Sequence, residues 1–317
     1  MDNPCGISTD VDLLREFERG LDPRRPERSR IPARILGYGE ISTVFEVQAE
    51  GMRGLACKRL PIFRDGAEVA RYEAVYAEYI RLLTEGIGLT LPPHGHCAFL
   101  DDAGRPVFYI VQQQLPYDSI GNRAIHLLPR SEALSLMRRI LGELRRVWAF
   151  NRRQEHLQVA IDGQISNWSI AGPAALLYVD TSTPLYRVAG VEQLDTELFL
   201  RSAPSFMAWL LRWLFLKDVV DRYYEPHRVV VDLIANLYKE QRADLIPDVI
   251  AAANNFLAGE AAELAVAPIA EREVRDYYRE DATIWRLYLA MRKVDRFIRA
   301  RLLRGRYPYI LPDEVKR

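Results

Sequence analysis

Hydrophobic positions recur with two different periods along the chain. Between residues 33 and 60, short apolar runs alternate with polar positions and are broken by glycines, which is typical of strands joined by tight turns. Residues 96–116 carry a hairpin pattern, in which the turn residues DDAG separate two apolar runs. The first third of the chain therefore predicts an antiparallel β-sheet.

A helical period interrupts these strands and then dominates. Apolar residues recur every three or four positions in GAEVARYEAVYAEYIRLLTEG, which predicts a helix that ends at Gly86. The same period predicts helices over 131–150, 203–218, 227–240, 244–258 and 270–303. We therefore expect an α+β fold with a domain boundary near Gln114. Residues 1–114 would form one domain, with a short helix and a linker at 1–32, and residues 115–317 a larger, mainly helical one.

Two carboxylates and a carboxamide stand out in VAIDGQISNWSIAGPAALLYVDTSTP. Five positions lead from Asp162 to Asn167, and thirteen more lead to Asp180 at the end of LLYV, an apolar run that predicts a strand. The oxygens of Asn167 and Asp180 are the hard donors that Mg²⁺ prefers, and Asp162 can accept the proton of a hydroxyl group. Taken alone, DGQISN can equally be an ordinary turn, because Asp, Gly, Ser and Asn favour turns.

A glycine pair and a lysine precede this segment. Gly37 and Gly39 lie between the first two predicted strands, where a backbone without Cβ can approach phosphates closely. Lys58 follows Val44 by fourteen residues, on the third predicted strand. Arg59 next to it is expected on the opposite face of that strand.

Together these residues resemble the protein-kinase-like superfamily. Gly37, Gly39 and Val44 match its G-x-G-x-x-G-x-V loop, with Ser42 in place of the third glycine, and Lys58 matches the lysine of V-A-I-K. The later residues match the D-x-x-x-x-N loop and the metal-binding aspartate of the superfamily at Asp162, Asn167 and Asp180.

Three motifs of protein kinases differ or are missing in this chain, which points to other members of the superfamily. Ala160-Ile161-Asp162 replaces H-R-D, Asp180-Thr181-Ser182 replaces D-F-G, and no A-P-E motif follows. The chain is therefore more similar to the aminoglycoside, choline and lipopolysaccharide-type kinases, as a further branch of the superfamily.

The resemblance implies a two-lobed fold that binds ATP and Mg²⁺. Lys58 would hold the phosphates, Glu73 would orient Lys58, and Asp162 would act as the base, while Asn167 and Asp180 would bind the metal. The alternative partner for Lys58 is Glu78, which the helical pattern places on the polar side of its helix. The remaining nucleotide contacts would come from Gly37, Gly39, Ser42, Val44 and the lobe-connecting residues Gln113 and Leu115.

Two functions are compatible with these candidate site residues. The first is an ATP- and Mg²⁺-dependent phosphotransferase acting on a hydroxyl of a small molecule or lipid headgroup. The second is a pseudokinase that binds nucleotide weakly or not at all and acts through a protein partner. A kinase-like chain can also transfer AMP in place of phosphate.

Composition agrees with a globular protein of the cytoplasm. Of 317 residues, 49% are hydrophobic and 27% charged, and 43 basic residues balance 43 acidic ones. This balance argues against a nucleic-acid-binding protein that relies on a basic surface. Three cysteines give no disulfide framework, and the N-terminus lacks the pattern of a signal peptide. The longest apolar run, FMAWLLRWLFL at 206–216, contains Arg212 and is too short for a membrane span.

Overall fold

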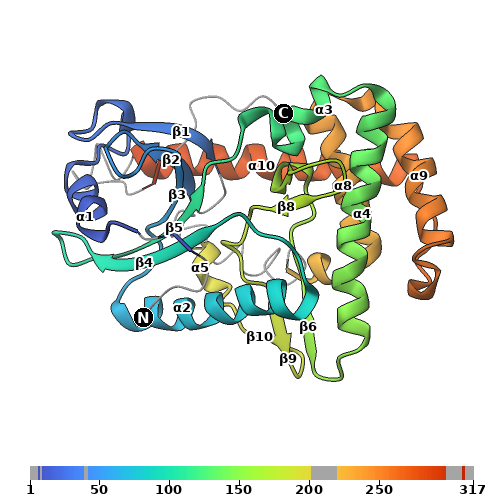
Figure 1. The fold of residues 1–317 in the computed structure, drawn as a ribbon, viewed down its shortest axis with the longest axis horizontal. Helices are drawn as coiled ribbons and strands as arrows, with labels where there is room; N and C mark the ends of the chain where they lie inside the picture. The colour runs from blue at the N-terminus through green and yellow to red at the C-terminus, as the bar shows by residue number, and fades with distance from the viewer. Residues whose placement is uncertain (1–5, 8, 39–41, 201–219, 298–308, 311–317) are drawn as a thin grey trace.

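The computed structural model describes residues 6–7, 9–38, 42–200, 220–297 and 309–310. The fold is α+β, as the sequence predicts. An antiparallel sheet of five strands with a helix comes first, and a mainly helical region follows, an arrangement consistent with a kinase-like two-lobe layout (Figure 1).

Five strands form the first sheet, in the order β1-β2-β3-β5-β4. They are β1 (Ala33–Tyr38), β2 (Thr43–Val47), β3 (Leu55–Leu60), β4 (His94–Leu100) and β5 (Pro106–Gln113). Successive residues of β5 belong to different apolar clusters, Tyr109 and Val111 to one and Phe108 and Ile110 to the other. Because side chains alternate along a strand, these clusters mark the two faces of the sheet.

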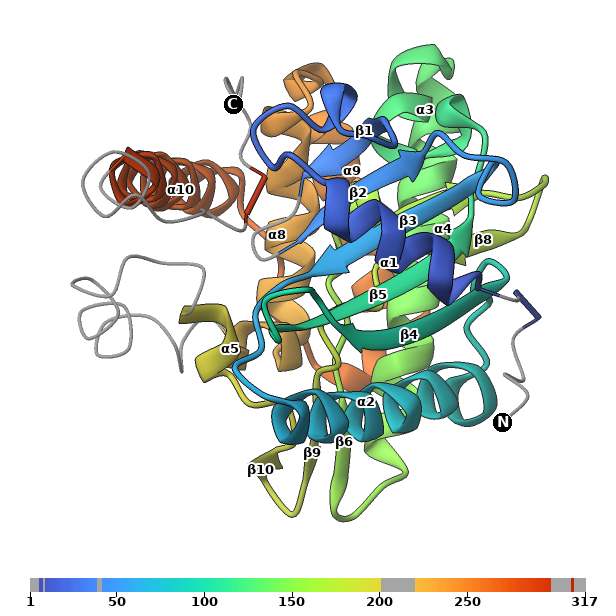
Figure 2. The ribbon, with the colours of Figure 1, turned by 90° about the vertical axis from the view of Figure 1, so that its left-hand side faces the viewer.

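A helix covers each face. Helix α1 (Val11–Gly20) packs Phe17 against Phe45 on one face, with the ring centroids 5.2 Å apart. Helix α2 (Gly66–Arg81) packs Tyr72 edge-on against Phe108 of the other face, at 5.0 Å. Figure 2 shows α1 lying across the sheet and α2 below β4.

The predicted α2 helix is confirmed, but its predicted end at Gly86 is wrong. The Asp65 side chain caps the N-terminus by accepting a hydrogen bond from the Glu68 N–H at 2.9 Å. After Arg81 the chain continues as a wider turn over Leu82–Ile87 and stops at Gly88. Gly88 has φ 80°, the left-handed conformation that a glycine adopts without strain, and this is why the helix ends two residues later than expected.

The helical region contains five longer helices in the part of the chain that the structure describes. They are α3 (Gly121–Leu127), α4 (Arg130–Arg152), α8 (Pro226–Lys239), α9 (Ile246–Ala258) and α10 (Glu271–Phe297). The helices predicted near 131, 227, 244 and 270 are thus confirmed, the last of them as far as Phe297. The segment 203–218 lies outside the described residues, and so does the apolar run 206–216.

Short strands lie between α4 and α8. They are β6 (Leu157–Val159), β7 (Trp168–Ile170), β8 (Leu176–Tyr178), β9 (Tyr186–Val188) and β10 (Val191–Glu192), followed by the short helix α5 (Glu197–Leu200). Strand β7 pairs with β8, and β9 lies between β10 and β6. The predicted strand over LLYV is confirmed as β8.

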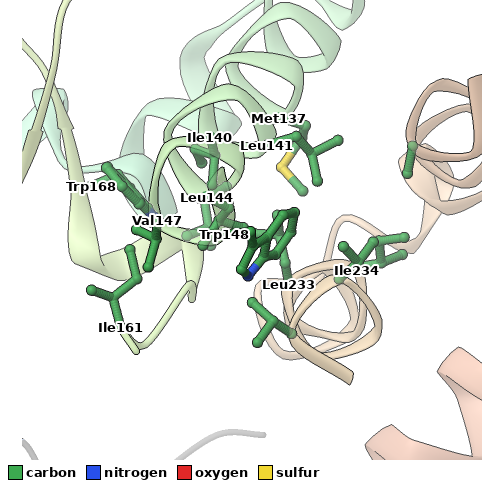
Figure 3. Close-up of a cluster of buried hydrophobic side chains, with 14 of the residues drawn as sticks. Met137, Ile140, Leu141, Leu144, Val147, Trp148, Ile161, Trp168, Leu233 and Ile234 are labelled. Atoms are coloured by element: carbon green, nitrogen blue, oxygen red, sulfur yellow. The ribbon is translucent and has the colours of Figure 1, made fainter. Parts of the chain in front are cut away.

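The largest apolar cluster supports the segment that carries Asp162 and Asn167. Trp148 of α4 lies near Leu233 of α8, and Ile161 and Trp168 flank Val147 (Figure 3). Ile161 and Trp168 are 2% and 1% exposed. Because cores are packed at crystal-like density, this cluster restricts the loop between them.

No described helix is both long enough and apolar enough to cross a membrane.

Candidate functional site

Strand pairing brings Asn167 next to Asp180. Trp168 of β7 pairs with Tyr178 of β8, so the residues that precede β7 and follow β8 lie side by side. The Val179 N–H donates to the Asn167 carbonyl at 2.9 Å, which extends the pairing by one step. Two of the sequence-predicted metal-binding residues therefore come together.

The loop from Asp162 to Asn167 is held by its own hydrogen bonds. The Gln164 N–H donates to Asp162 Oδ1 at 3.1 Å, and Asn167 Nδ2 donates to the Asp162 carbonyl at 3.2 Å. Trp168 Nε1 donates to the Gly163 carbonyl at 3.3 Å. The bond from Gln164 is one that an ordinary turn also makes, whereas the bonds from Asn167 and Trp168 close the loop and fix Asp162 relative to Asn167.

Two glycines allow this loop to pack closely. A Cβ on Gly121, at the start of α3, would lie 2.3 Å from the Ile165 carbonyl oxygen. A Cβ on Gly163 would lie 3.1 Å from a methyl group of Val229 and 3.2 Å from one of Leu144. Larger residues at these positions would push on the loop from both sides.

Lys58 reaches Asp180 across the two parts of the fold. Lys58 Nζ lies 2.6 Å from Asp180 Oδ1, and the Ser182 N–H and Oγ donate to the same oxygen at 3.1 and 2.9 Å. Burial alone would raise the pKa of Asp180, but the Lys58 ammonium and the bonds from Ser182 hold that pKa below its usual value. Asp180 therefore stays charged at neutral pH.

The site retains oxygens suited to a cation. Within the described residues, every hydrogen bond to Asp180 falls on Oδ1, and Asn167 makes its side-chain bond through Nδ2. Asp180 Oδ2 and Asn167 Oδ1 thus remain for a metal, and both are the hard ligands that Mg²⁺ selects. Across the described ranges, no group of three or more His, Cys, Asp or Glu residues could hold a metal ion. A magnesium ion here would therefore depend on phosphate or water oxygens for its other ligands.

Asp162 has the electrostatics of a base that works near neutral pH. Burial and the neighbouring Asp232 carboxylate of α8 raise the pKa of Asp162 to about 7, against the opposing bond from the Gln164 N–H. Burial also raises the pKa of Asp232, while Arg222 opposes the rise. Two carboxylates close together in a partly buried place resist ionising together, so Asp162 can exchange a proton in this range.

The structure does not bring Glu73 to Lys58. Glu73 Oε1 lies 3.1 Å from His96 Nε2 on β4, and Lys58 pairs with Asp180 instead. The helical phase explains this placement, because the adjacent Tyr72 faces the sheet and Glu73 is turned about 100° away from it. Glu78 pairs with Arg81 at 2.7 Å on the outer side of the helix, in agreement with its expected polar position.

The predicted nucleotide loop is only partly within the described residues. Gly37 pairs with Val44 after an irregularity in the register of β1 and β2, and Val44 pairs with Lys58. Ser42 precedes β2 and is 7% exposed. Gly39 lies outside the described residues. The pairing places Gly37, Val44 and Lys58 in one row across three strands.

The two predicted hinge residues differ in what they can offer a ligand. The Gln113 N–H donates to the Pro93 carbonyl at 2.9 Å, and the Gln114 N–H donates to the Gly54 carbonyl at 2.7 Å. Those two donors are therefore already used within the protein. The Leu115 N–H has no acceptor among the described residues. Of the two predicted residues, Gln113 and Leu115, only Leu115 therefore has an N–H that can donate to a ligand.

A pocket lies beside the loop, between α8 and α10. Its polar lining consists of Gln164, Asp232, Asn236, Lys239, Tyr277 and Asp281. Lys239 Nζ donates to Gln164 Oε1 at 3.3 Å, which ties the pocket to the loop that carries Asp162. The pocket is thus adjacent to the loop of Asp162 and is lined by Asp232, and the pKa values of both carboxylates are raised.

Sequence reasoning did not identify Asp232 or Gln112. Asp232 stands in VVVDLIA, and an acidic residue inside such an apolar helical run is itself a signal. Gln112 Nε2 donates to the Val179 carbonyl at 3.0 Å, next to Asp180. No pattern in the sequence indicates that contact, because it joins residues from distant segments.

A model of a family of unknown function, DUF6206, matches residues 25–296. The chain belongs to this family, since the match spans most of its length. No curated protein matches the chain.

Proposed function

We propose that this member of the DUF6206 family is an ATP- and Mg²⁺-dependent phosphotransferase that acts on a hydroxyl of a small molecule or lipid headgroup. The observation that carries the proposal is the meeting of Lys58 from β3 with Asp180, next to Asn167 and the loop of Asp162. Phosphoryl transfer depends on positioning and on charge neutralisation, and this set provides a cation, metal ligands and a base.

Each residue has a role that follows from its contacts. Lys58 would bind the phosphates, and its present bond to Asp180 keeps its ammonium at the metal-binding side of the site. Asn167 Oδ1 and Asp180 Oδ2 would hold Mg²⁺. A bound Mg²⁺ supplies neutralisation of the phosphate charge. Leu115 would bind adenine through its backbone, with Gly37, Gly39, Ser42 and Val44 near the phosphates.

Asp162 would take the proton of the acceptor hydroxyl. Its pKa of about 7 is well matched to that task, because a base is most effective when its pKa lies near the working pH. The pocket lined by Gln164, Asp232, Lys239 and Tyr277 adjoins the Asp162 loop, but its volume of about 10 Å³ has room for a water molecule and not for the acceptor.

Glu73 can orient Lys58 in this proposal only if its hydrogen bonds change. To orient Lys58, its carboxylate would have to leave His96, to which it is bonded at 3.1 Å. Lys58 could keep its bond to Asp180, because its ammonium has three N–H donors.

The second candidate is a pseudokinase that acts through a protein partner. The ion pair between Lys58 and Asp180 favours it, because the ammonium occupies one oxygen of the carboxylate that would bind the metal. The missing histidine of H-R-D and phenylalanine of D-F-G point the same way.

Thermal unfolding with and without excess Mg-ATP separates the two. At a hundredfold excess over Kd, a bound ligand adds about 2.7 kcal/mol to the native state, which raises Tm by several degrees. We expect this shift in the wild type and in the control Asp12→Ala, whose carboxylate is exposed on α1, and no shift in Asp180→Ala. A wild type that no nucleotide stabilises would contradict the phosphotransferase and favour the pseudokinase.

Turnover then tests the base. Asp162→Asn should lose about 10²–10⁴-fold in turnover while its ATP affinity is little changed. Mass analysis of a reacted acceptor distinguishes a phosphate adduct from an AMP adduct.

A further inference from the structure

Helix α2 directs three tyrosine hydroxyls at the segments that carry Asp162 and Asp180. Tyr72, Tyr76 and Tyr79 follow one another at helical spacing, so they lie on one face of α2. They are 3%, 0% and 0% exposed. Glu73, which the superfamily resemblance makes the partner of Lys58, lies beside this face and binds His96 instead.

Two of these hydroxyls bind the residues directly after Asp180. Tyr72 donates to the Ser182 carbonyl at 2.9 Å, and the Tyr76 hydroxyl shares a hydrogen bond with Thr181 Oγ1 at 3.2 Å. Ser182 in turn donates its N–H and Oγ to Asp180 Oδ1. Ser182 therefore links α2 to the Asp180 carboxylate, since its carbonyl is bonded to Tyr72 and its N–H and hydroxyl are bonded to Asp180.

The third hydroxyl binds the other segment. Tyr79 donates to the Ala160 carbonyl at 2.9 Å, two residues before Asp162. It is also hydrogen-bonded to Tyr178, whose hydroxyl accepts from the Asp162 N–H at 3.2 Å. One helix face thus reaches both parts of the site.

Packing fixes where these hydroxyls lie. Tyr72 contacts Phe63 and Phe108 with ring centroids 5.1 and 5.0 Å apart, and Tyr76 lies edge-on to His96 at 5.3 Å. Burial raises the pKa of Tyr72 well above its usual value, so that hydroxyl remains a neutral donor. Rings held in a dense core give the hydrogen bonds a fixed geometry.

We propose that Tyr72 and Tyr76 are positioning residues that hold Asp180 in its metal-binding orientation through Thr181 and Ser182. In this chain, tyrosines would thereby couple α2 to the site, the role expected for an ion pair between Glu73 and Lys58. The inference rests on the proposed function for its metal, but the contacts on which it stands can be tested without nucleotide.

The test compares Tyr72→Phe/Tyr76→Phe with Tyr109→Phe. Tyr109 is a suitable control because its ring is also fully buried and its hydroxyl donates to Glu18 at 2.7 Å, on the opposite face of the sheet. Both variants remove only hydroxyl oxygens, so they create no large cavity. Hydrogen–deuterium exchange over residues 178–186 reports the first consequence, and the magnesium concentration for half-maximal stabilisation by ATP reports the second.

We expect the Ser182 amide to exchange about fivefold faster in the double variant and at the wild-type rate in Tyr109→Phe, since the lost hydrogen bond from Tyr72 to Ser182 is worth roughly 1 kcal/mol, a factor of about five. The half-maximal magnesium concentration should rise about fivefold in the double variant alone, because its metal-binding carboxylate is less well placed.

Equal exchange over 178–186 in the double variant and the wild type would overturn the inference. Faster exchange with an unchanged magnesium requirement would overturn it too, since the bonds would then be structural only. If Mg-ATP does not stabilise the wild type, the phosphotransferase assignment fails, and so does the role of the tyrosines in metal binding. Faster exchange in the double variant would then still establish that α2 is coupled to Asp180.

Discussion

Strand β3 carries two neighbouring cations that form very different ion pairs. Arg59 faces α1 and binds Glu18, with Nε and Oε2 2.8 Å apart, and both side chains are almost fully buried. Lys58 faces the other way and binds Asp180, whose side chain is 29% exposed. Two adjacent positions of β3 thus form one ion pair inside the core and one ion pair that solvent can reach.

The two pairs also differ in how completely they are satisfied. Both oxygens of Glu18 are bonded to Arg59, and Tyr109 adds a further bond to Oε2. The bonds to Asp180 from the described residues converge on one oxygen. A saturated buried pair holds structure together, whereas a pair with a remaining oxygen can bind a ligand.

The largest expected effect comes from breaking the buried pair. Glu18→Gln leaves the Arg59 charge uncompensated, and the free energy of unfolding should fall by about 3–5 kcal/mol in urea titrations. The control Asp12→Asn removes the partner of Arg15 from a pair whose side chains are 91% and 51% exposed, and should cost less than about 1 kcal/mol. Similar losses in both variants would refute the distinction between closed and open pairs.

A smaller effect, of opposite sign, is expected at Asp162. Because its pKa is raised to about 7 in the folded protein, the native state binds more protons than the unfolded state between about pH 4 and pH 7. Stability therefore falls as the pH rises through this range. Asp162→Asn removes that loss and should be about 1–3 kcal/mol more stable than the wild type at pH 8, with little difference near pH 4. Measuring unfolding at both pH values checks the sign, and a variant less stable at pH 8 would contradict the raised pKa.

The smallest effect is expected at Glu73. Its pair with His96 is half exposed, so Glu73→Gln should change stability by less than about 1 kcal/mol and leave stabilisation by Mg-ATP intact. Loss of the nucleotide effect in this variant would instead establish Glu73 as the partner of Lys58 during nucleotide binding.

Sequence patterns predicted the fold class and grouped distant residues into one site. The motif spacing marked Lys58 and Asp180, 122 positions apart, as residues of one site, and the structure joins them directly. That contact itself was not predicted, because the expected partner of Lys58 was Glu73. Strand alternation also placed Arg59 on the opposite face from Lys58. These features follow from periodicity and motif spacing, which can be read from the sequence alone.

The remaining features depend on information that no local pattern holds. The apolar period predicted the buried side of α2 correctly, with Tyr72, Tyr76 and Tyr79 on it. It could not show which side chain Glu73 meets beside that face, because His96 comes from β4, a separate segment of the sheet. The N–H of Gln113 is used because Pro93 lies across from it in the sheet. Asp232 acts on Asp162 through space, from a helix 70 residues away along the chain. The domain boundary near Gln114 stays a prediction.

The most direct test measures the Kd for Mg-ATP in two variants that differ by one position of β3. Lys58→Met alters the open pair, and Arg59→Met combined with Glu18→Gln neutralises the closed one while keeping an acceptor for Tyr109. We predict that Lys58→Met loses at least about tenfold in affinity and that the Arg59 variant binds like the wild type, since only the first removes a cation from the site. Wild-type affinity in Lys58→Met, or equal losses in both, would contradict the account.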